Sequence, residues 1–146
     1  MSKTNNMETE MLELYFNNTT HAGIGDATGI VGSTADGSLY ISLHTSDPGE
    51  TGNQGSNEIS YTGYAREAVA RTSGGWTIAD DNCSNTAAIT FGQCTAGSGT
   101  ATHFGVGVDA TGAGDLLYYG ALDSSLAISA GITPEFAIGD LDITEA

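Results

Sequence analysis

Positive charge is what this sequence lacks most. Among 146 residues there are three Lys and Arg against eighteen Asp and Glu, so the formal net charge is −15. Lys3, Arg66 and Arg71 are too few to form a basic patch, which argues against binding to a nucleic-acid backbone. An anionic membrane surface would repel the chain for the same reason. A protein partner with a basic surface is compatible with this charge.

Long hydrophobic runs and cysteines are also scarce. No run approaches the roughly 20 apolar residues that a membrane-spanning helix needs. The first six residues are polar and no apolar stretch follows them, so we expect no secretory signal and synthesis in a cytoplasm. In such a reducing compartment Cys83 and Cys94 are interpreted as small half-buried side chains, and a disulfide formed after release from the cell is the alternative.

The residue patterns of common catalytic and ligand sites are missing as well. His21, His44 and His103 lie in different predicted elements without metal-binding spacing, so we interpret them as hydrogen-bonded structural histidines. The Gly-rich stretch at 23–29 lacks the Gly-Lys-Ser/Thr ending of a phosphate loop, and no GxSxG motif is present. Asp-rich turns could hold calcium, but the DxDxDG pattern is absent. We therefore predict no enzyme, no cofactor and no metal site.

Glycine is abundant, with 21 residues, and it separates short segments of alternating polarity. Leu39, Ile41 and Leu43 show this period of two, which is typical of strands. About eight such segments predict an all-β protein, an antiparallel β-sandwich or jelly roll. The segment 116–122 is apolar on both faces and is predicted to be a central strand. The other expected strands lie at 39–44, 66–71, 76–78, 87–91, 102–108, 126–128, 132–136 and 141–143.

One short helix is predicted at the N-terminus. Thr4, Asn5 or Asn6 can cap it, and acidic residues follow in the early turns. A helix of about ten residues does not persist alone in water, so it must dock on its own domain or on a neighbouring subunit. Its apolar residues recur at helical spacing: Met7, Met11, Leu14 and Tyr15, widened by Leu12 and Phe16.

The Gly-rich segment at 21–38 connects this helix to the first strong strand. Such a long connection is uncommon in compact domains and often makes contacts, and it can reach another subunit. We therefore divide the chain into an N-terminal helix and Gly-rich arm, residues 1–38, and a sandwich domain, residues 39–146. Met7, Met11, Leu14, Tyr15, Ile24 and Ile30 are the predicted partner-binding residues. The alternative is that the helix caps an open end of its own sandwich.

Four residues are predicted to be structural. Asp47 and Pro48 begin a turn. Tyr64 and Arg66 lie beside the start of a strand, and an arginine in a chain with almost no other cations is expected to pair with an acid and bridge two elements.

An ordered series of segments resembles a family of small virion proteins of tailed phages, often labelled tail-fibre or head-decoration proteins. The Gly-rich insert is longer than is usual in that family. The resemblance implies a sandwich or jelly roll and a structural role in the particle, and it implies no catalytic residues. The matching segments are the helix at 8–16, LYISLHTSDPGETG, ISYTGYAREAVAR, NTAAITF, ATHFGVG, LLYYGAL and ITPEFAIGDLDIT.

Our first functional hypothesis is therefore a capsid decoration (cement) protein on the outer capsid surface, made in the host cytoplasm. Its expected partners are the major capsid protein and further copies of itself in a dimer or trimer, with no nucleic acid and no membrane. The second hypothesis is a tail or tail-fibre component. The third is a carbohydrate-binding sandwich, for which Trp76 and six tyrosines could supply stacking faces. An enzyme is the last.

Overall fold

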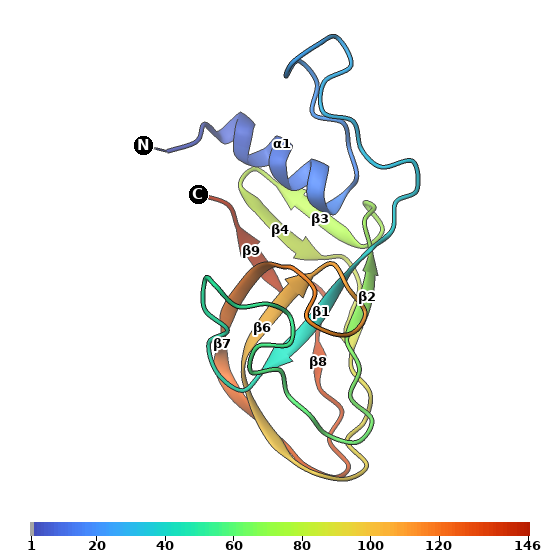
Figure 1. The fold of residues 1–146 in the computed structure, drawn as a ribbon, viewed down its shortest axis with the longest axis vertical. Coiled ribbons are helices and arrows are strands. Elements are labelled where there is room, and N and C mark those ends of the chain that lie inside the picture. Colours follow the sequence, from blue (N-terminus) through green and yellow to red (C-terminus); the bar gives the residue numbers. More distant parts are fainter. Residues whose placement is uncertain (1) are drawn as a thin grey trace. The chain divides into compact units, whose positions relative to one another are not determined.

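The computed structural model of the protein describes residues 2–146, which form one helix and nine strands (Figure 1). This confirms the predicted class, mostly β with one short N-terminal helix. The elements are α1 (Asn5–Phe16), β1 (Ser38–His44), β2 (Glu67–Ala70), β3 (Trp76–Ala79), β4 (Asn82–Asn85), β5 (Ile89–Thr90), β6 (Gly99–Gly107), β7 (Leu116–Ile128), β8 (Glu135–Phe136) and β9 (Asp142–Thr144).

The strands form three sheets. Their orders are β2-β1-β6-β7, β3-β4-β9 and β5-β8. The pairs β1–β6, β6–β7, β3–β4 and β4–β9 are antiparallel. β7 lies at the edge of its sheet, so the prediction of a central strand at 116–122 is wrong. Apolar residues on both faces of this strand do not require a strand on both sides of it. The finer expectation of a sandwich or jelly roll stays a prediction.

The chain divides into two compact units. Unit 1 comprises Met1–Ser38, Ala70–Ala88 and Phe136–Ala146, and unit 2 comprises Leu39–Val69 and Ile89–Glu135. One boundary between the units follows Ser38. That residues 39–146 form an independent domain stays a prediction.

In unit 1, α1 packs on the hairpin of β3 and β4. Thr4 caps the helix with its side chain, which accepts a hydrogen bond from the backbone N–H of Met7. Leu12 and Phe16, four residues apart on one face, are fully buried. The ring of Phe16 meets Trp76 of β3 edge-on, with 4.8 Å between centroids.

Asn85, at the end of β4, ties the C-terminal segment of unit 1 to the hairpin. Its side chain donates to the carbonyls of Ala87 (2.7 Å) and Ala137 (2.8 Å) and accepts from the backbone N–H of Leu141 (2.9 Å). It is 1% exposed, so a buried polar side chain here satisfies backbone groups that have no strand partner.

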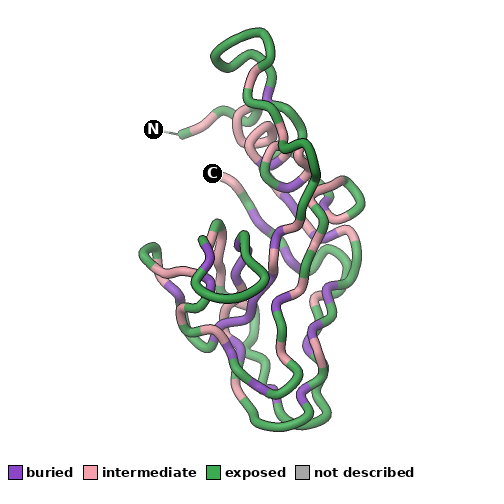
Figure 2. The backbone as a smooth tube through the Cα atoms, turned by 45° about the vertical axis from the view of Figure 1, so that its right-hand side comes forward, coloured by how far each residue is buried: buried purple, intermediate pink, exposed green. Residues whose placement is uncertain are grey.

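Unit 2 is built on the antiparallel pair β1 and β6. Leu39, Ile41 and Leu43 are buried, as their alternation predicts, and Figure 2 shows how buried positions are distributed along the chain. Two glycines of β6 lie opposite residues of β1. Gly105 is the register partner of Ser42, and Gly107 is the register partner of Tyr40. A Cβ at Gly105 would lie 2.7 Å from the Oγ of Ser42, so only glycine allows this approach.

Candidate functional site

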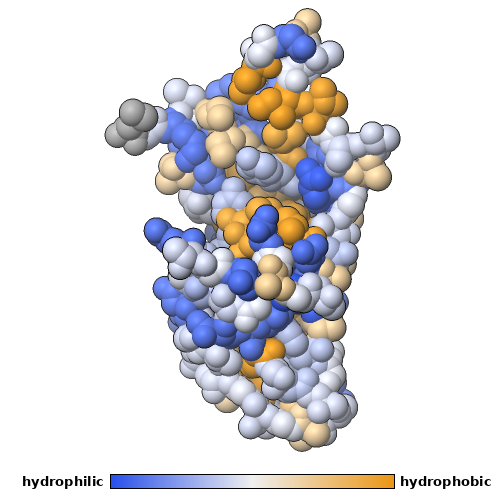
Figure 3. All heavy atoms as spheres, in the orientation of Figure 1, coloured by the Kyte–Doolittle hydropathy of each residue, from blue (hydrophilic) through white to orange (hydrophobic). Residues whose placement is uncertain are grey.

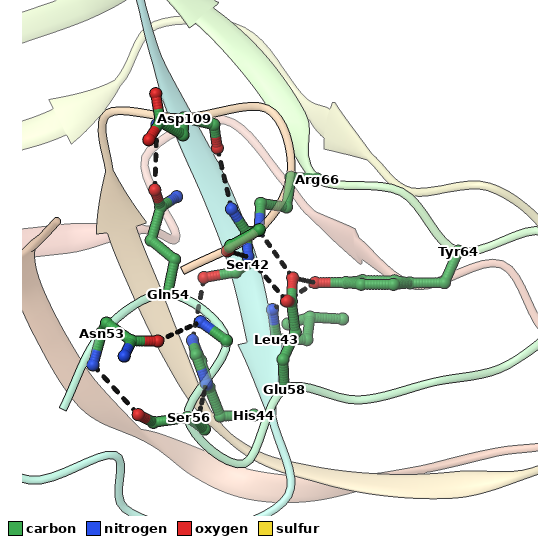
Figure 4. A network of polar contacts seen from close by, with 12 residues as sticks. Ser42, Leu43, His44, Asn53, Gln54, Ser56, Glu58, Tyr64, Arg66 and Asp109 are labelled. Atoms are coloured by element: carbon green, nitrogen blue, oxygen red, sulfur yellow. Dashed lines mark hydrogen bonds and ion pairs between the residues drawn. The ribbon is translucent and has the colours of Figure 1, made fainter. Parts of the chain in front are cut away.

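A network of polar side chains occupies unit 2 and contains two of the predicted structural residues (Figure 4). It joins β1, the segment between β1 and β2, and the loop that follows β6. The labelled members are Ser42, Leu43, His44, Asn53, Gln54, Ser56, Glu58, Tyr64, Arg66 and Asp109.

Arg66 and Glu58 form the ionic centre of this network. Nε and Nη2 of Arg66 each donate to a different carboxylate oxygen of Glu58 at 2.7 Å, the bidentate geometry that suits guanidinium and carboxylate. Their side chains are 3% and 18% exposed. The hydrogen bonds to Glu58 raise the pKa of Arg66. The expected pairing of Arg66 with an acid is present in the structure.

The same arginine holds the loop after β6. Nη1 donates to the carbonyl of Asp109 at 2.9 Å, and Nη2 donates to the carbonyl of Gly112 at 2.6 Å. Gln54 is fully buried, and its side-chain oxygen accepts the backbone N–H of Asp109 at 2.9 Å. Arg66 and Gln54, each more than 40 residues away from this loop in the sequence, therefore fix it from two positions.

Tyr64 links Glu58 to β1. Its hydroxyl donates to the carboxylate of Glu58 at 2.9 Å and accepts the backbone N–H of Leu43 at 3.1 Å. Burial raises the pKa of this phenol above its ordinary value, so it stays protonated. Tyr64 thus satisfies a strand N–H that would otherwise lack a partner.

Ser42 and His44 lie together as a serine hydroxyl and an imidazole do in some hydrolases. Oγ of Ser42 is 2.8 Å from Nε2 of His44, and Nδ1 of His44 is 2.8 Å from the carbonyl of Ser56. The carbonyl accepts, so Nδ1 carries the hydrogen and Nε2 accepts from Ser42. Burial lowers the pKa of His44 and keeps it neutral.

The Ser42–His44 pair has no space for a substrate. Both residues are 0% exposed. A Cβ at Gly105 would lie 2.6 Å from Nε2 of His44, so the backbone of β6 covers the pair directly. We conclude that these residues form a structural hydrogen-bonded chain, because a nucleophile must reach the atom that it attacks.

Asp47 and Pro48 form the turn predicted from their sequence. The carboxylate of Asp47 accepts the backbone N–H of Gly49 at 2.8 Å, and Gly49 has a φ of 74°. The side chain of Asn57 donates to the carbonyl of Asp47 at 3.0 Å. Pro48 is buried. This turn leads from β1 into the segment that carries Glu58.

The remaining side chains that bear on chemistry are dispersed or buried. Among residues 2–146, no three His, Cys, Asp or Glu side chains are placed to hold a metal ion. No helix in that range has the length and apolar composition for crossing a membrane. Cys83 and Cys94 are both free and buried, and burial raises the pKa of Cys83 to about 12. Trp76 is fully buried, so it offers no stacking face for a sugar.

The predicted partner-binding residues all lie in unit 1 and differ in exposure. Met7, Met11 and Leu14 are half-buried. The exposed fractions of Tyr15, Ile24 and Ile30 are 41%, 41% and 44%. Val31, which is not among the predicted residues, is more exposed than any of them at 63%. The sequence marks Val31 only as an aliphatic residue within a Gly-rich connection, which is a weak indication of a binding role.

From here on we restrict the name arm to residues 19–36, which lie between α1 and β1. The arm is closed at its neck by two backbone hydrogen bonds between His21 and Ile30, both 3.0 Å long. Nε2 of His21 also contacts the carboxylate of Glu10 in α1. A Cβ at Gly29 would lie 2.3 Å from the carbonyl of His21, so the neck depends on a glycine there. Figure 2 shows that most of the arm is exposed.

A comparison with protein families finds one that covers nearly the whole chain. The family model described as Podophage GP4 fiber I protein gp80 matches residues 2–144. The match includes α1, the arm and both units. It bears out the resemblance to small structural proteins of tailed phages. No curated protein sequence matches the chain.

Proposed function

The chain belongs to the podophage GP4 fiber I protein gp80 family, and on this premise we propose that it is a non-enzymatic structural subunit of a phage fibre. That it is a structural protein of the phage virion follows from the family. The proposal goes further than the family in two respects: it places the protein in a fibre, and it assigns the protein no catalytic activity.

The match over residues 2–144 is the observation that carries the proposal. The chemistry of unit 2 supports it. The groups that could have served catalysis, His44 and the Arg66–Glu58 pair, are instead bonded to one another or to the backbone in a covered network. Such networks rigidify a fold.

The outer capsid surface is a second candidate location, with the major capsid protein as partner. The charge is compatible with it, because a chain of net charge −15 suits a surface that does not touch packaged DNA. A fibre has the same requirement. Self-association in a dimer or trimer is compatible with both locations.

Immunogold labelling of purified particles, together with mass spectrometry of separated heads and tails, tests the proposal. We expect label on the fibres and peptides of this chain in the tail fraction. Label spread over the head would replace the fibre location with capsid decoration. A protein that is abundant in the lysate but missing from the particles would contradict the structural role altogether.

A further inference from the structure

The arm presents aliphatic side chains to solvent at closely spaced positions. Ile24, Ile30 and Val31 are 41%, 44% and 63% exposed and lie within eight residues of one another. Figure 3 shows hydrophobic side chains gathered over this part of unit 1. Single exposed apolar residues are ordinary, but a group of them on one loop marks an interaction surface.

The arm is held in shape by contacts at its base. Asn18, with a φ of 56°, follows α1. Its amide group donates to the carbonyl of Ser33 at 2.8 Å and accepts the backbone N–H of Ser33 at 2.7 Å. A Cβ at Gly32 would lie 2.2 Å from the carbonyl of Asn18, so the two sides of the arm touch.

Arg71 fixes this base to the helix. It donates to the carbonyls of Tyr15 (2.6 Å) and Leu14 (2.7 Å) at the end of α1, and to Oγ of Ser33 (3.0 Å) in the arm. Together with the His21–Ile30 pair, these bonds fix the arm before any partner arrives. A loop that is already ordered loses less entropy on binding.

The charges around the arm indicate what covers it. Asp26 and Asp36 lie on the arm, and Glu8, Glu10 and Glu13 lie on α1. All three cations of the chain have partners inside the same chain: Lys3 with Glu145, Arg66 with Glu58, and Arg71 with the end of α1. A second copy of this chain would therefore bring acids but no unpartnered Lys or Arg side chain. Complementary charge must come from a different protein.

We infer that the arm is a preformed docking element whose Ile24, Ile30 and Val31 enter an apolar pocket rimmed by Lys or Arg on another virion protein. This depends on the proposed role as a virion subunit and adds the binding segment and the chemistry of its partner.

Incorporation of tagged full-length chains into particles during infection tests this inference. The host expresses a tagged copy, and mass spectrometry gives the ratio of tagged to untagged chains in purified particles. We expect a double variant, Ile24→Ser with Val31→Ser, to be incorporated at least about tenfold less than tagged wild type, because burial of a single large aliphatic side chain corresponds to about a tenfold change in affinity or more. Ile138→Ser is the matched control, since Ile138 is 70% exposed and lies outside the arm, and it should behave as wild type.

A second pair of variants tests the charged rim. Asp26→Asn keeps the side-chain oxygen that accepts the backbone N–H of Thr28 at 2.8 Å but removes the charge. We expect it to lower incorporation several-fold, whereas Asp123→Asn, outside the arm, should not. Circular dichroism and thermal melting of each purified variant establish that it is folded.

The outcomes separate this inference from the proposed function. If tagged wild type does not enter particles, the virion role itself fails. If it enters and the double variant enters equally well, only the docking role of the arm is overturned. If the purified chain self-associates in sedimentation experiments and the double variant abolishes this, a second copy covers the arm and the inference is likewise overturned. Unchanged incorporation of Asp26→Asn would overturn the basic rim.

Discussion

Arg66 uses all three nitrogens of its guanidinium group inside unit 2, on the carboxylate of Glu58 and on two loop carbonyls. Arg66→Ala would leave Glu58 without its cation and the carbonyls of Asp109 and Gly112 without a donor. Breaking such a buried pair typically costs about 3–5 kcal/mol, and we expect a loss of that order in the free energy of unfolding. Urea unfolding at neutral pH measures it.

Two control variants show what the arginine contributes. Lys3→Ala removes a partly exposed ion pair with Glu145 and should cost no more than about 1 kcal/mol. Arg66→Lys keeps the charge but not the planar fork, so it should lie between wild type and Arg66→Ala. Equal and small effects for Lys3→Ala and Arg66→Ala would contradict the central position of this pair.

His44 gives unit 2 a dependence on pH. Burial lowers its pKa in the folded protein, whereas the unfolded chain has a value of about 6.5. Below that pH the unfolded state binds the proton before the folded state does, so stability falls. Above about pH 6.5 both states are neutral and the contribution of His44 is fully present.

Melting curves of wild type and His44→Gln between about pH 7.5 and pH 5 measure this contribution, since acidification through the unfolded histidine pKa is the relevant window. We expect the wild type to lose more stability than the variant over that range. The subtraction removes the effect of the carboxylates that both proteins share. Parallel curves for the two proteins would show that protonation of His44 is not coupled to unfolding.

At the residue scale, the sequence was informative where a residue type was rare. Arg66 stood out as one of three cations, and its pairing could be predicted, although its partner could not. Gln54 and Ser56 could not be predicted as members of the network. They are common polar residues in a turn-rich segment, and they meet Asp109 and His44 only after the chain has folded.

Among the elements, α1 depends on two side chains for its docking. Phe16 is fully buried and contacts Trp76, while Tyr15, the preceding residue, is 41% exposed. Phe16→Ala should lower the free energy of unfolding by about 3–5 kcal/mol, because it leaves a cavity against the hairpin. Tyr15→Ala is the control on the same helix and should cost far less. Hydrogen exchange of the α1 amides reports whether the helix has detached; similar protection in both variants would contradict this docking.

The strands show which patterns can be read from sequence. β1 was predicted within one residue of its observed bounds because Leu39, Ile41 and Leu43 alternate cleanly. β4, with the sequence NCSN, was missed because asparagine and serine are typical of turns. Its inward positions are Cys83 and Asn85, and Asn85 is stable there only because segments far along the chain satisfy its amide.

At the scale of the whole molecule, the way in which unit 1 is assembled could not be predicted from the sequence. Its three segments come from the start, the middle and the end of the chain. The need to cover the apolar residues of α1 could be predicted, but the hairpin that covers them could not. Local periodicity carries no information about which distant strand a helix meets.

The net charge of the whole molecule leads to a prediction about salt. Eighteen acids face three cations, and each cation is already paired or bonded within the chain, so the remaining acids repel one another in the compact state.

Raising NaCl from about 20 mM to about 500 mM shortens the screening length from more than 20 Å to about 4 Å and should raise the melting temperature at pH 7. For a chain of this size each kcal/mol gained corresponds to about 2–4 °C. The buried Arg66–Glu58 pair is screened much less than exposed charges, so its loss should not offset the gain. A melting temperature that falls with salt at pH 7 would show that local ion pairs, rather than repulsion among acids, dominate the electrostatic part of the stability.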